Sequence, residues 1–162
     1  MGNWVIRAIK KEDNQSVAKL IRSVFDEMEI PKVGTAYEDP YLDLMFEEYN
    51  KSKSVYFVVE NNGEIVGCCG IAPLENGDPT ICELQKMYFL PKTRGLGIGT
   101  KMMEKCLEEA KRFGFERCYI ETMPFMYAAQ KLYVKSGFEY LDAPLGSTGH
   151  DSCSVWMLKS LD

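Results

Sequence analysis

Residues 83–100 read ELQKMYFLPKTRGLGIGT, a strand-like segment that runs into a glycine-rich loop. The composition of residues 81–90 predicts a β-strand, and Pro91 marks its end. Glycine then occupies every second position from 95 to 99, where a helical pattern begins. Glycine lets backbone N–H groups approach a ligand closely, and a helix N-terminus carries about half a positive charge. The segment therefore predicts a cradle for an anion such as phosphate.

Two common phosphate-binding patterns do not fit this loop. Walker A requires a Gly-Lys pair, but Lys101 follows Thr100. The dinucleotide-binding fingerprint is G-x-G-x-x-G and opens its domain, whereas residues 95–99 read GLGIG and several expected elements precede them. A nucleotide-binding domain is therefore the weaker alternative. A plain glycine-rich turn between strand and helix also stays open at this point.

The patterns on both sides of this segment predict an α/β (α+β) fold. Strands are expected at residues 4–9, 55–60, 65–72, 81–90, 118–121, 138–141 and 154–158. Helices are expected at residues 17–28, 40–49, 98–113 and 125–136. Long helices between strands imply crossover connections, so the helices should cover a mixed sheet.

Length and composition narrow the class of protein. The 162 residues contain no linker or low-complexity stretch, so residues 1–162 are expected to form one domain. With 19 basic and 24 acidic residues the net charge is −5, which argues against nucleic acid as the main partner. No run approaches the roughly 18 apolar residues that would cross a membrane, and no signal peptide is recognisable. A cytoplasmic protein without a membrane partner is therefore expected.

Six cysteines lie mostly within apolar runs, and none forms a CxxC pair. Because His150 is the single histidine, a zinc site would have few ligands, and no metal is expected. Buried free thiols in a cytoplasmic protein are the favoured interpretation. The cysteines are Cys68, Cys69, Cys82, Cys106, Cys118 and Cys153.

Three motifs resemble one family. Residues 94–99, RGLGIG, are similar to the Q/R-x-x-G-x-G/A motif of the GCN5-related N-acetyltransferases (GNAT), which wraps the pyrophosphate of acetyl-coenzyme A. Residues 83–91 resemble the family's fourth strand, and residues 129–138, AQKLYVKSGF, resemble its A-x-x-L-Y-x-x-x-G-F segment. The order of expected elements also matches, so the resemblance covers nearly the whole chain. It implies a mixed, mostly antiparallel central sheet of about seven strands flanked by about four helices, with the fourth and fifth strands splayed apart.

The resemblance implies an N-acetyltransferase that moves an acetyl group from acetyl-CoA to a primary amine by direct attack in a ternary complex. Main-chain groups of Met87, Tyr88 and Phe89 would contact pantetheine, with an N–H near Met87 facing the thioester carbonyl. The pyrophosphate would be held by Arg94, Gly95, Leu96, Gly97, Ile98, Gly99 and Thr100. Arg94 is alternatively a solvated loop charge, although a cation beside a bound anion is favoured.

Acetyl transfer requires a base, an oxyanion donor and an acid. Glu83 is the candidate base, acting through water, and is expected to share a strand face with Gln85 and Met87. Alternatively, Glu83 is an exposed or ion-paired strand residue without a catalytic role. The acceptor amine would then lose its proton to waters and backbone carbonyls. Tyr133 is the candidate acid, because a phenol pKa of about 10 lies close to that of an alkyl thiol. Its alternative is a core aromatic residue.

Family analogy places acceptor recognition in residues 25–49 and 142–153. Tyr37 and Tyr41, beside acidic neighbours, would form a wall for a cationic amine, and His150 lies in the second segment. Solvated loops are the alternative for both segments. The acceptor is expected to be a small-molecule amine or a protein or peptide amine, and the family's frequent dimers suggest a homodimer.

Met126 is the one departure from the family pattern. It occupies a position at which the family often has Asn, so a cofactor contact made by that Asn is not expected here. This departure favours a rival interpretation, a non-catalytic acyl-CoA-binding module. The presence of both Glu83 and Tyr133 argues against that rival.

Overall fold

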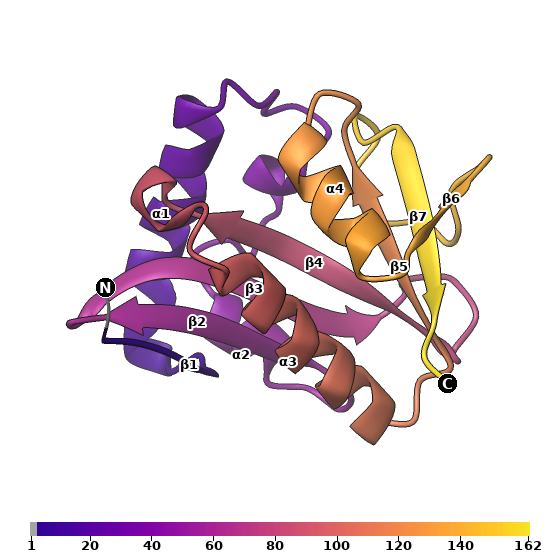
Figure 1. The fold of residues 1–162 in the computed structure, drawn as a ribbon, viewed down its shortest axis with the longest axis horizontal. Helices are drawn as coiled ribbons and strands as arrows, with labels where there is room; N and C mark the ends of the chain where they lie inside the picture. The colour runs from indigo at the N-terminus through magenta and orange to yellow at the C-terminus, as the bar shows by residue number, and fades with distance from the viewer. Residues whose placement is uncertain (1–2) are drawn as a thin grey trace.

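A seven-stranded mixed sheet lies at the centre of the computed structural model, which describes residues 3–162 (Figure 1). The strands are β1 (Trp4–Ala8), β2 (Val55–Asn61), β3 (Glu64–Pro73), β4 (Ile81–Phe89), β5 (Arg117–Thr122), β6 (Glu139–Leu141) and β7 (Val155–Ser160). Their spatial order is β1-β2-β3-β4-β5-β7-β6, and β4–β5 is the parallel pair among antiparallel neighbours. The predicted mixed, mostly antiparallel sheet is confirmed.

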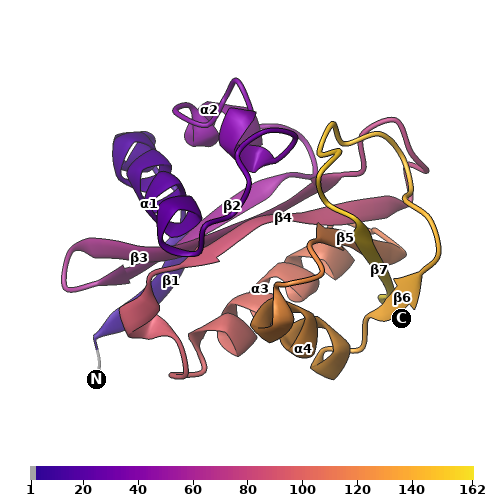
Figure 2. The ribbon, with the colours of Figure 1, turned by 90° about the horizontal axis from the view of Figure 1, so that it is seen from above.

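Within residues 3–162, four α-helices cover the two faces of this sheet. They are α1 (Asn14–Glu27), α2 (Met45–Tyr49), α3 (Ile98–Arg112) and α4 (Tyr127–Lys135). Figure 2 shows α1 and α2 on one face and α3 and α4 on the other. Each face has its own apolar core, one built with Leu20 and Phe25 of α1, the other with Met102 and Cys106 of α3. The spacing of these residues is the helical pattern that the sequence shows.

The second helix is shorter than predicted. A helix was expected over residues 40–49, but residues 40–43 form turns and α2 begins only at Met45. The side chain of Asn14, at the start of α1, accepts a 2.8 Å hydrogen bond from the amide of Phe46. Because the first amides of a helix lack internal partners, this contact stabilises a helix start at that point.

A β-bulge interrupts the pairing of β4 with β3, and the pairing of β4 with β5 ends ahead of this bulge. Cys68 lies opposite Tyr88, whereas Gly70 lies opposite Gln85, so one residue of β3 faces two residues of β4. Lys86, in the bulge, has a left-handed φ of 51°. Within the described chain, β4 pairs with β5 only at residues 81–83. The predicted splay of the fourth and fifth strands is thereby confirmed.

The bulge also changes which side chains of β4 face which layer. Leu84 packs in the core beneath α3, and so does Met87, three positions later. Regular alternation would put Met87 on the same face as Glu83, as predicted, but the extra residue reverses the alternation. The prediction that Met87 shares a face with Glu83 and Gln85 is therefore wrong.

All six cysteines are free thiols, and five of them are buried. The prediction of free thiols is confirmed. Between residues 3 and 162, no helix has both the length and the apolar character needed to cross a bilayer.

Candidate active site

The backbone of the glycine loop between β4 and α3 is not covered by other atoms at Gly95 and Gly97. Gly95 and Gly97 have φ values of 82° and 81°, a left-handed conformation that favours glycine. A Cβ atom built at either position would meet no atom within 4 Å. These glycines are therefore required by the backbone conformation, and they leave the approach to the loop clear.

The amides of this loop are unpaired. Among residues 3–162, no backbone or side-chain group accepts a hydrogen bond from the amides of residues 95–100. The first amide of α3 that is bonded is that of Lys101, which donates to the carbonyl of Gly97 at 3.2 Å. Six neighbouring donors at the start of a long helix fit a diphosphate, because each orphan amide gains an acceptor and the helix dipole favours negative charge.

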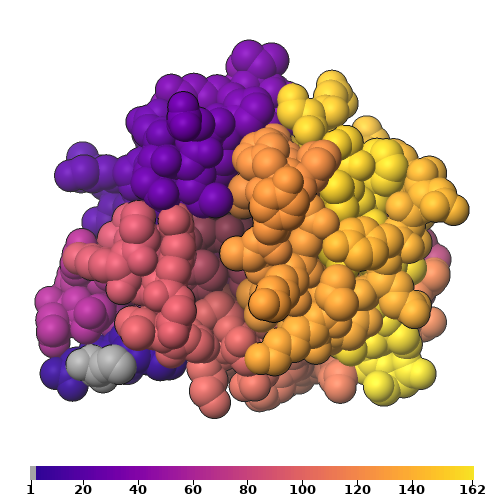
Figure 3. Space-filling view, turned by 45° about the horizontal axis from the view of Figure 1, so that its top comes forward, coloured from indigo at the N-terminus to yellow at the C-terminus, as the bar shows by residue number. Residues whose placement is uncertain are grey.

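A groove of about 690 Å³ runs from this loop past the end of β4 to α4. Figure 3 shows it between the salmon residues around α3 and the orange residues of α4. Its volume is in the range of small-molecule sites. Nine of the ten predicted cofactor residues line it: Met87, Tyr88, Phe89, Arg94, Gly95, Gly97, Ile98, Gly99 and Thr100. The tenth, Leu96, is not among the lining residues, and its exposed fraction is 45%.

The guanidinium of Arg94 is already engaged. It pairs with the Glu27 carboxylate of α1 at 2.8 and 3.2 Å and donates to the carbonyl of Phe89 at 2.8 Å. An ion pair this exposed is worth at most about 1 kcal/mol, so a bound diphosphate would compete for Arg94 at little cost. Arg94 therefore lies at the groove, where its side chain is paired with Glu27 of α1.

Tyr133 lies where the groove meets a second, smaller cavity. Its side chain is buried, and its hydroxyl lies 4.0 Å from the Sδ of Met87. Burial raises the pKa of Tyr133 well above its usual 10, so the hydroxyl stays protonated at neutral pH. The expected match between phenol and thiol pKa values is therefore not met in the free protein. Met126 also lines both cavities, where it adds apolar surface.

The smaller cavity has a volume of about 80 Å³ and contains Glu83. Glu83 is 4% exposed, and the side-chain amide of Gln85 donates a 2.7 Å hydrogen bond to its carboxylate. Burial raises the pKa of Glu83 to about 7, and the negative charge of Glu121 adds to this effect. No Lys, Arg or His of the described residues forms an ion pair with either carboxylate. A carboxyl with such a pKa is suited to accept a proton near neutral pH.

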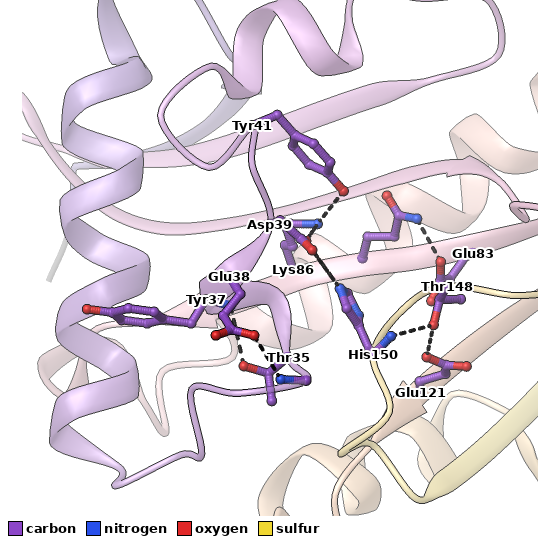
Figure 4. A network of polar contacts seen from close by, with 12 residues as sticks. Thr35, Tyr37, Glu38, Asp39, Tyr41, Glu83, Lys86, Glu121, Thr148 and His150 are labelled. Atoms are coloured by element: carbon purple, nitrogen blue, oxygen red, sulfur yellow. Dashed lines mark hydrogen bonds and ion pairs between the residues drawn. The ribbon is translucent and has the colours of Figure 1, made fainter.

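Three ionisable residues from separate segments meet beside this cavity (Figure 4). The Lys86 ammonium lies 2.6 Å from the Asp39 carboxylate and donates to the Tyr41 hydroxyl at 3.0 Å. The Nε2 atom of His150 lies 3.1 Å from the same Asp39 carboxylate. The structure therefore brings the predicted residues Tyr41 and His150 into one group, Tyr41 through Lys86 and His150 through Asp39.

Tyr37, the third predicted acceptor residue, lies apart from this group. Its ring points away from Asp39 in Figure 4 and packs edge-on against Phe25, with the Lys32 ammonium 4.9 Å from the ring centroid. Tyr37 is not among the residues that line either cavity. The structure thus does not bring Tyr37 and Tyr41 together as one aromatic wall.

The pKa values of the three charged residues reflect their mutual contact. Burial would raise the pKa of Asp39, but the His150 hydrogen bond and the Lys86 charge lower it. Burial would lower the pKa values of Lys86 and His150, yet their contacts with Asp39 raise both. All three groups thus favour their charged forms more than isolated side chains would.

Sequence reasoning missed Lys86, Glu121 and Thr148. Glu121 accepts hydrogen bonds from Thr148 at 2.5 Å and from the Tyr119 hydroxyl at 2.7 Å, which orient its carboxylate beside the cavity. A lysine within the otherwise mostly apolar run of residues 84–90 was the available signal for Lys86. The sequence contains no comparable signal for Glu121 and Thr148, because polar residues near strand ends and in loops are common.

Comparisons with known proteins give one consistent result. The family model described as the acetyltransferase (GNAT) family matches residues 19–138. The uncharacterized N-acetyltransferase YjgM of Escherichia coli is 44% identical over 158 residues, covering 97% of this chain and 95% of YjgM.

Solved structures share the fold. An acetyltransferase of the GNAT family from Staphylococcus aureus has a TM-score of 0.88 at 22% identity, with 99% of this chain and 100% of that one covered. The structure of yncA from Salmonella typhimurium, a putative acetyltransferase with its cofactor acetyl-CoA, has a TM-score of 0.78 at 18% identity, covering 99% and 95%. At these identities the likeness concerns the fold alone.

Proposed function

The chain belongs to the acetyltransferase (GNAT) family, and we propose that it transfers an acetyl group from acetyl-CoA to a primary amine by direct attack in a ternary complex. The observation that carries this proposal is the junction of two cavities. The groove with the unpaired amides and the cavity with Glu83 share Met87, Tyr88, Met126 and Tyr133. A thioester in the groove and an amine in the cavity would meet at this junction.

Acetyl-CoA supplies the acetyl thioester, and the groove offers groups for its diphosphate, its pantetheine amides and its thioester carbonyl. The amides of residues 95–100 would hold the diphosphate. The edge of β4 beyond Glu83, which has no partner on β5 in the described chain, would offer backbone groups to the pantetheine amides. A backbone N–H near Met87 would donate to the thioester carbonyl oxygen, where negative charge develops.

Glu83 and Tyr133 would move the protons of the reaction. The acceptor ammonium loses a proton to Glu83 through water, and the free nitrogen attacks the carbonyl carbon. A C–N bond then forms, the C–S bond breaks, and the Tyr133 hydroxyl donates its proton to the departing thiolate. The second proton of the attacking nitrogen leaves as the amide forms and returns through water to the Tyr133 phenolate. The buried positions of both groups keep the base near its working pKa and the acid protonated.

The charge of the smaller cavity supports a cationic acceptor. Glu83 and Glu121 both line it and lack a basic partner within the described chain. An ammonium group would balance this negative charge. The small volume suits the aminoalkyl end of a small molecule or of a flexible peptide.

The test is a screen of amine acceptors with acetyl-CoA, read by release of free thiol, together with melting curves in CoA. CoA should raise the melting temperature, because it binds the folded state, and thiol release should depend on an added amine. A melting shift with no turnover on any amine would support a non-catalytic acyl-CoA-binding module instead. No shift at saturating CoA would contradict the assignment of the groove.

A further inference from the structure

A buried network of contacts between Lys86, Asp39 and His150 joins three segments that are distant in the sequence. Lys86 lies in the β4 bulge, Asp39 follows the 3-10 turn Ala36–Glu38, and His150 lies in the segment before β7 (Figure 4). The Lys86 ammonium lies 2.6 Å from Asp39, and His150 Nε2 lies 3.1 Å from the same carboxylate. Asp39 is thus the central member, shared between a lysine and a histidine.

The Lys86, Asp39 and His150 side chains are shielded from water, and Lys86 is held in place. The Lys86 side chain is 1% exposed, and those of Asp39 and His150 are 14% and 17% exposed. A buried ammonium without a partner is strongly destabilising, so Lys86 favours states in which Asp39 stays beside it. The backbone of Lys86 is also held, because its carbonyl accepts a 2.7 Å hydrogen bond from the Tyr56 hydroxyl.

The Lys86–Asp39–His150 contacts hold together the two segments that form walls of the acceptor cavity. Thr35 and Ala36 from one segment, and His150 and Cys153 from the other, line that cavity beside Glu83. Ser152 also joins the segments, since its amide donates to the carbonyl of Gly34 at 3.0 Å and its hydroxyl to that of Val33 at 2.7 Å. The Lys86–Asp39–His150 chain then connects both segments to the bulge.

We propose that Lys86 is a positioning residue for the acceptor amine: its buried ammonium holds Asp39, Asp39 holds the His150 imidazole, and the chain fixes the walls of the cavity beside Glu83. Lys86 acts through Asp39 and His150 and does not itself contact the reacting atoms. The proposal rests on the proposed function, because it assigns the cavity to the acceptor.

Lys86 also sets the charge of His150. The charged groups around His150 are Asp39 from the first segment, Lys86 and Glu83 from β4, and Glu121 from β5. Asp39 favours the protonated imidazole, and the Lys86 ammonium opposes this effect. Without Lys86, His150 alone would balance Asp39 and would hold its proton to higher pH.

The experiment compares Lys86→Met with the double variant Lys86→Met/Asp39→Asn. In Lys86→Met, the KM of the acceptor should rise about tenfold or more, while the KM of acetyl-CoA stays within about twofold. Folding stability should fall in the single variant and recover in the double variant, because removing both charges leaves neither one buried alone. The acceptor KM should stay high in the double variant, since His150 has lost its charged partner. Lys92→Met, which removes an exposed lysine ion-paired with Glu64, is the matched control.

A second readout does not need turnover. His150 is the single histidine of the chain, so its imidazole gives one NMR titration curve. Its titration midpoint should move to higher pH by about one unit in Lys86→Met and not in Lys92→Met. An unmoved midpoint in folded Lys86→Met would overturn the proposal, and so would a parental acceptor KM in the double variant. If the parent protein acetylates no amine, the proposed function fails by itself, and the titration still decides whether Lys86 controls His150.

Discussion

Gln85 and Lys86 are consecutive residues of β4, and both side chains face the α1–α2 layer. The Tyr49 hydroxyl donates to the Gln85 side chain at 2.5 Å, and Lys86 donates to Tyr41 at 3.0 Å. The bulge makes this arrangement, because its extra residue interrupts the alternation of side chains. It gathers Glu83, Gln85 and Lys86 on the acceptor side and leaves Met87 on the side of α3. One inserted residue thus enriches the polar character of the acceptor cavity.

Glu83→Gln should remove the proton acceptor while it preserves the shape of the side chain. We expect kcat to fall about 100-fold or more, the usual contribution of a positioned base. In the parent, kcat/KM should rise with pH and level off above about 7, because the Glu83 carboxylate, with its pKa of about 7, must be ionised to act. The variant should lack this rise. Steady-state rates over a pH series provide the measurement.

Glu108→Gln is the control for that experiment, because Glu108 is exposed on α3, away from both cavities. It should keep the parental rate and pH profile. An unchanged kcat in Glu83→Gln, under conditions where chemistry limits the rate, would favour proton loss to waters and backbone carbonyls.

Glu83 should also make folding stability depend on pH. Its folded-state pKa of about 7 lies above the ordinary 4.5, so its stabilising contribution is complete below about pH 4.5 and is lost as the pH rises through 7. The loss corresponds to about 3 kcal/mol. Glu83→Gln lacks this titration, so its free energy of unfolding relative to the parent should increase from about pH 4 to about pH 8. Urea unfolding measures this difference, and parallel stability curves would contradict the burial of an ionisable Glu83.

The fold was largely predictable from the sequence, because apolar spacing and turn residues report local structure directly. The boundary of α2 was not, since it depends on a contact between Asn14 and Phe46, which are far apart in the sequence. The glycine loop was predictable because left-handed backbone and close approach both require glycine. The roles of Glu83 and Tyr133 stay predictions until they are tested.

The ionic chain around Asp39 could not be found in the sequence. Lys86 reaches Asp39 only because the bulge turns it toward α2, and strand alternation alone gives no sign of a bulge. His150 and Asp39 are 111 positions apart, so their contact is a property of the tertiary fold. Isolated residues in two loops carry no signal of this kind.

Gly97→Ala should abolish most CoA binding, and Gly114→Ala is its matched control. Both glycines have left-handed backbones, with φ values of 81° and 89°, and a Cβ atom at either one meets nothing within 4 Å. Each alanine should therefore cost about 1–2 kcal/mol of stability from backbone strain. Only the Cβ at Gly97 would enter the space in front of the unpaired amides.

Calorimetric titration with CoA measures the difference between the two variants. Gly97→Ala should weaken binding about tenfold or more, whereas Gly114→Ala should bind as the parent does. Equal affinities for CoA in both variants would mean that the diphosphate binds elsewhere.

Tyr133→Phe should slow the chemical step without disturbing the cofactor groove. The ring stays packed in the core, and the lost hydroxyl has only a weak 4.0 Å contact with Met87, so stability should change little. Loss of the proton donor to the thiolate should lower kcat about 100-fold, while CoA affinity stays within about twofold. Tyr140→Phe removes an exposed hydroxyl that bonds to Gln130 and should leave both quantities unchanged. Single-turnover rates isolate the chemical step, and equal rates for Tyr133→Phe and the parent would make Tyr133 a core aromatic residue with no part in proton transfer.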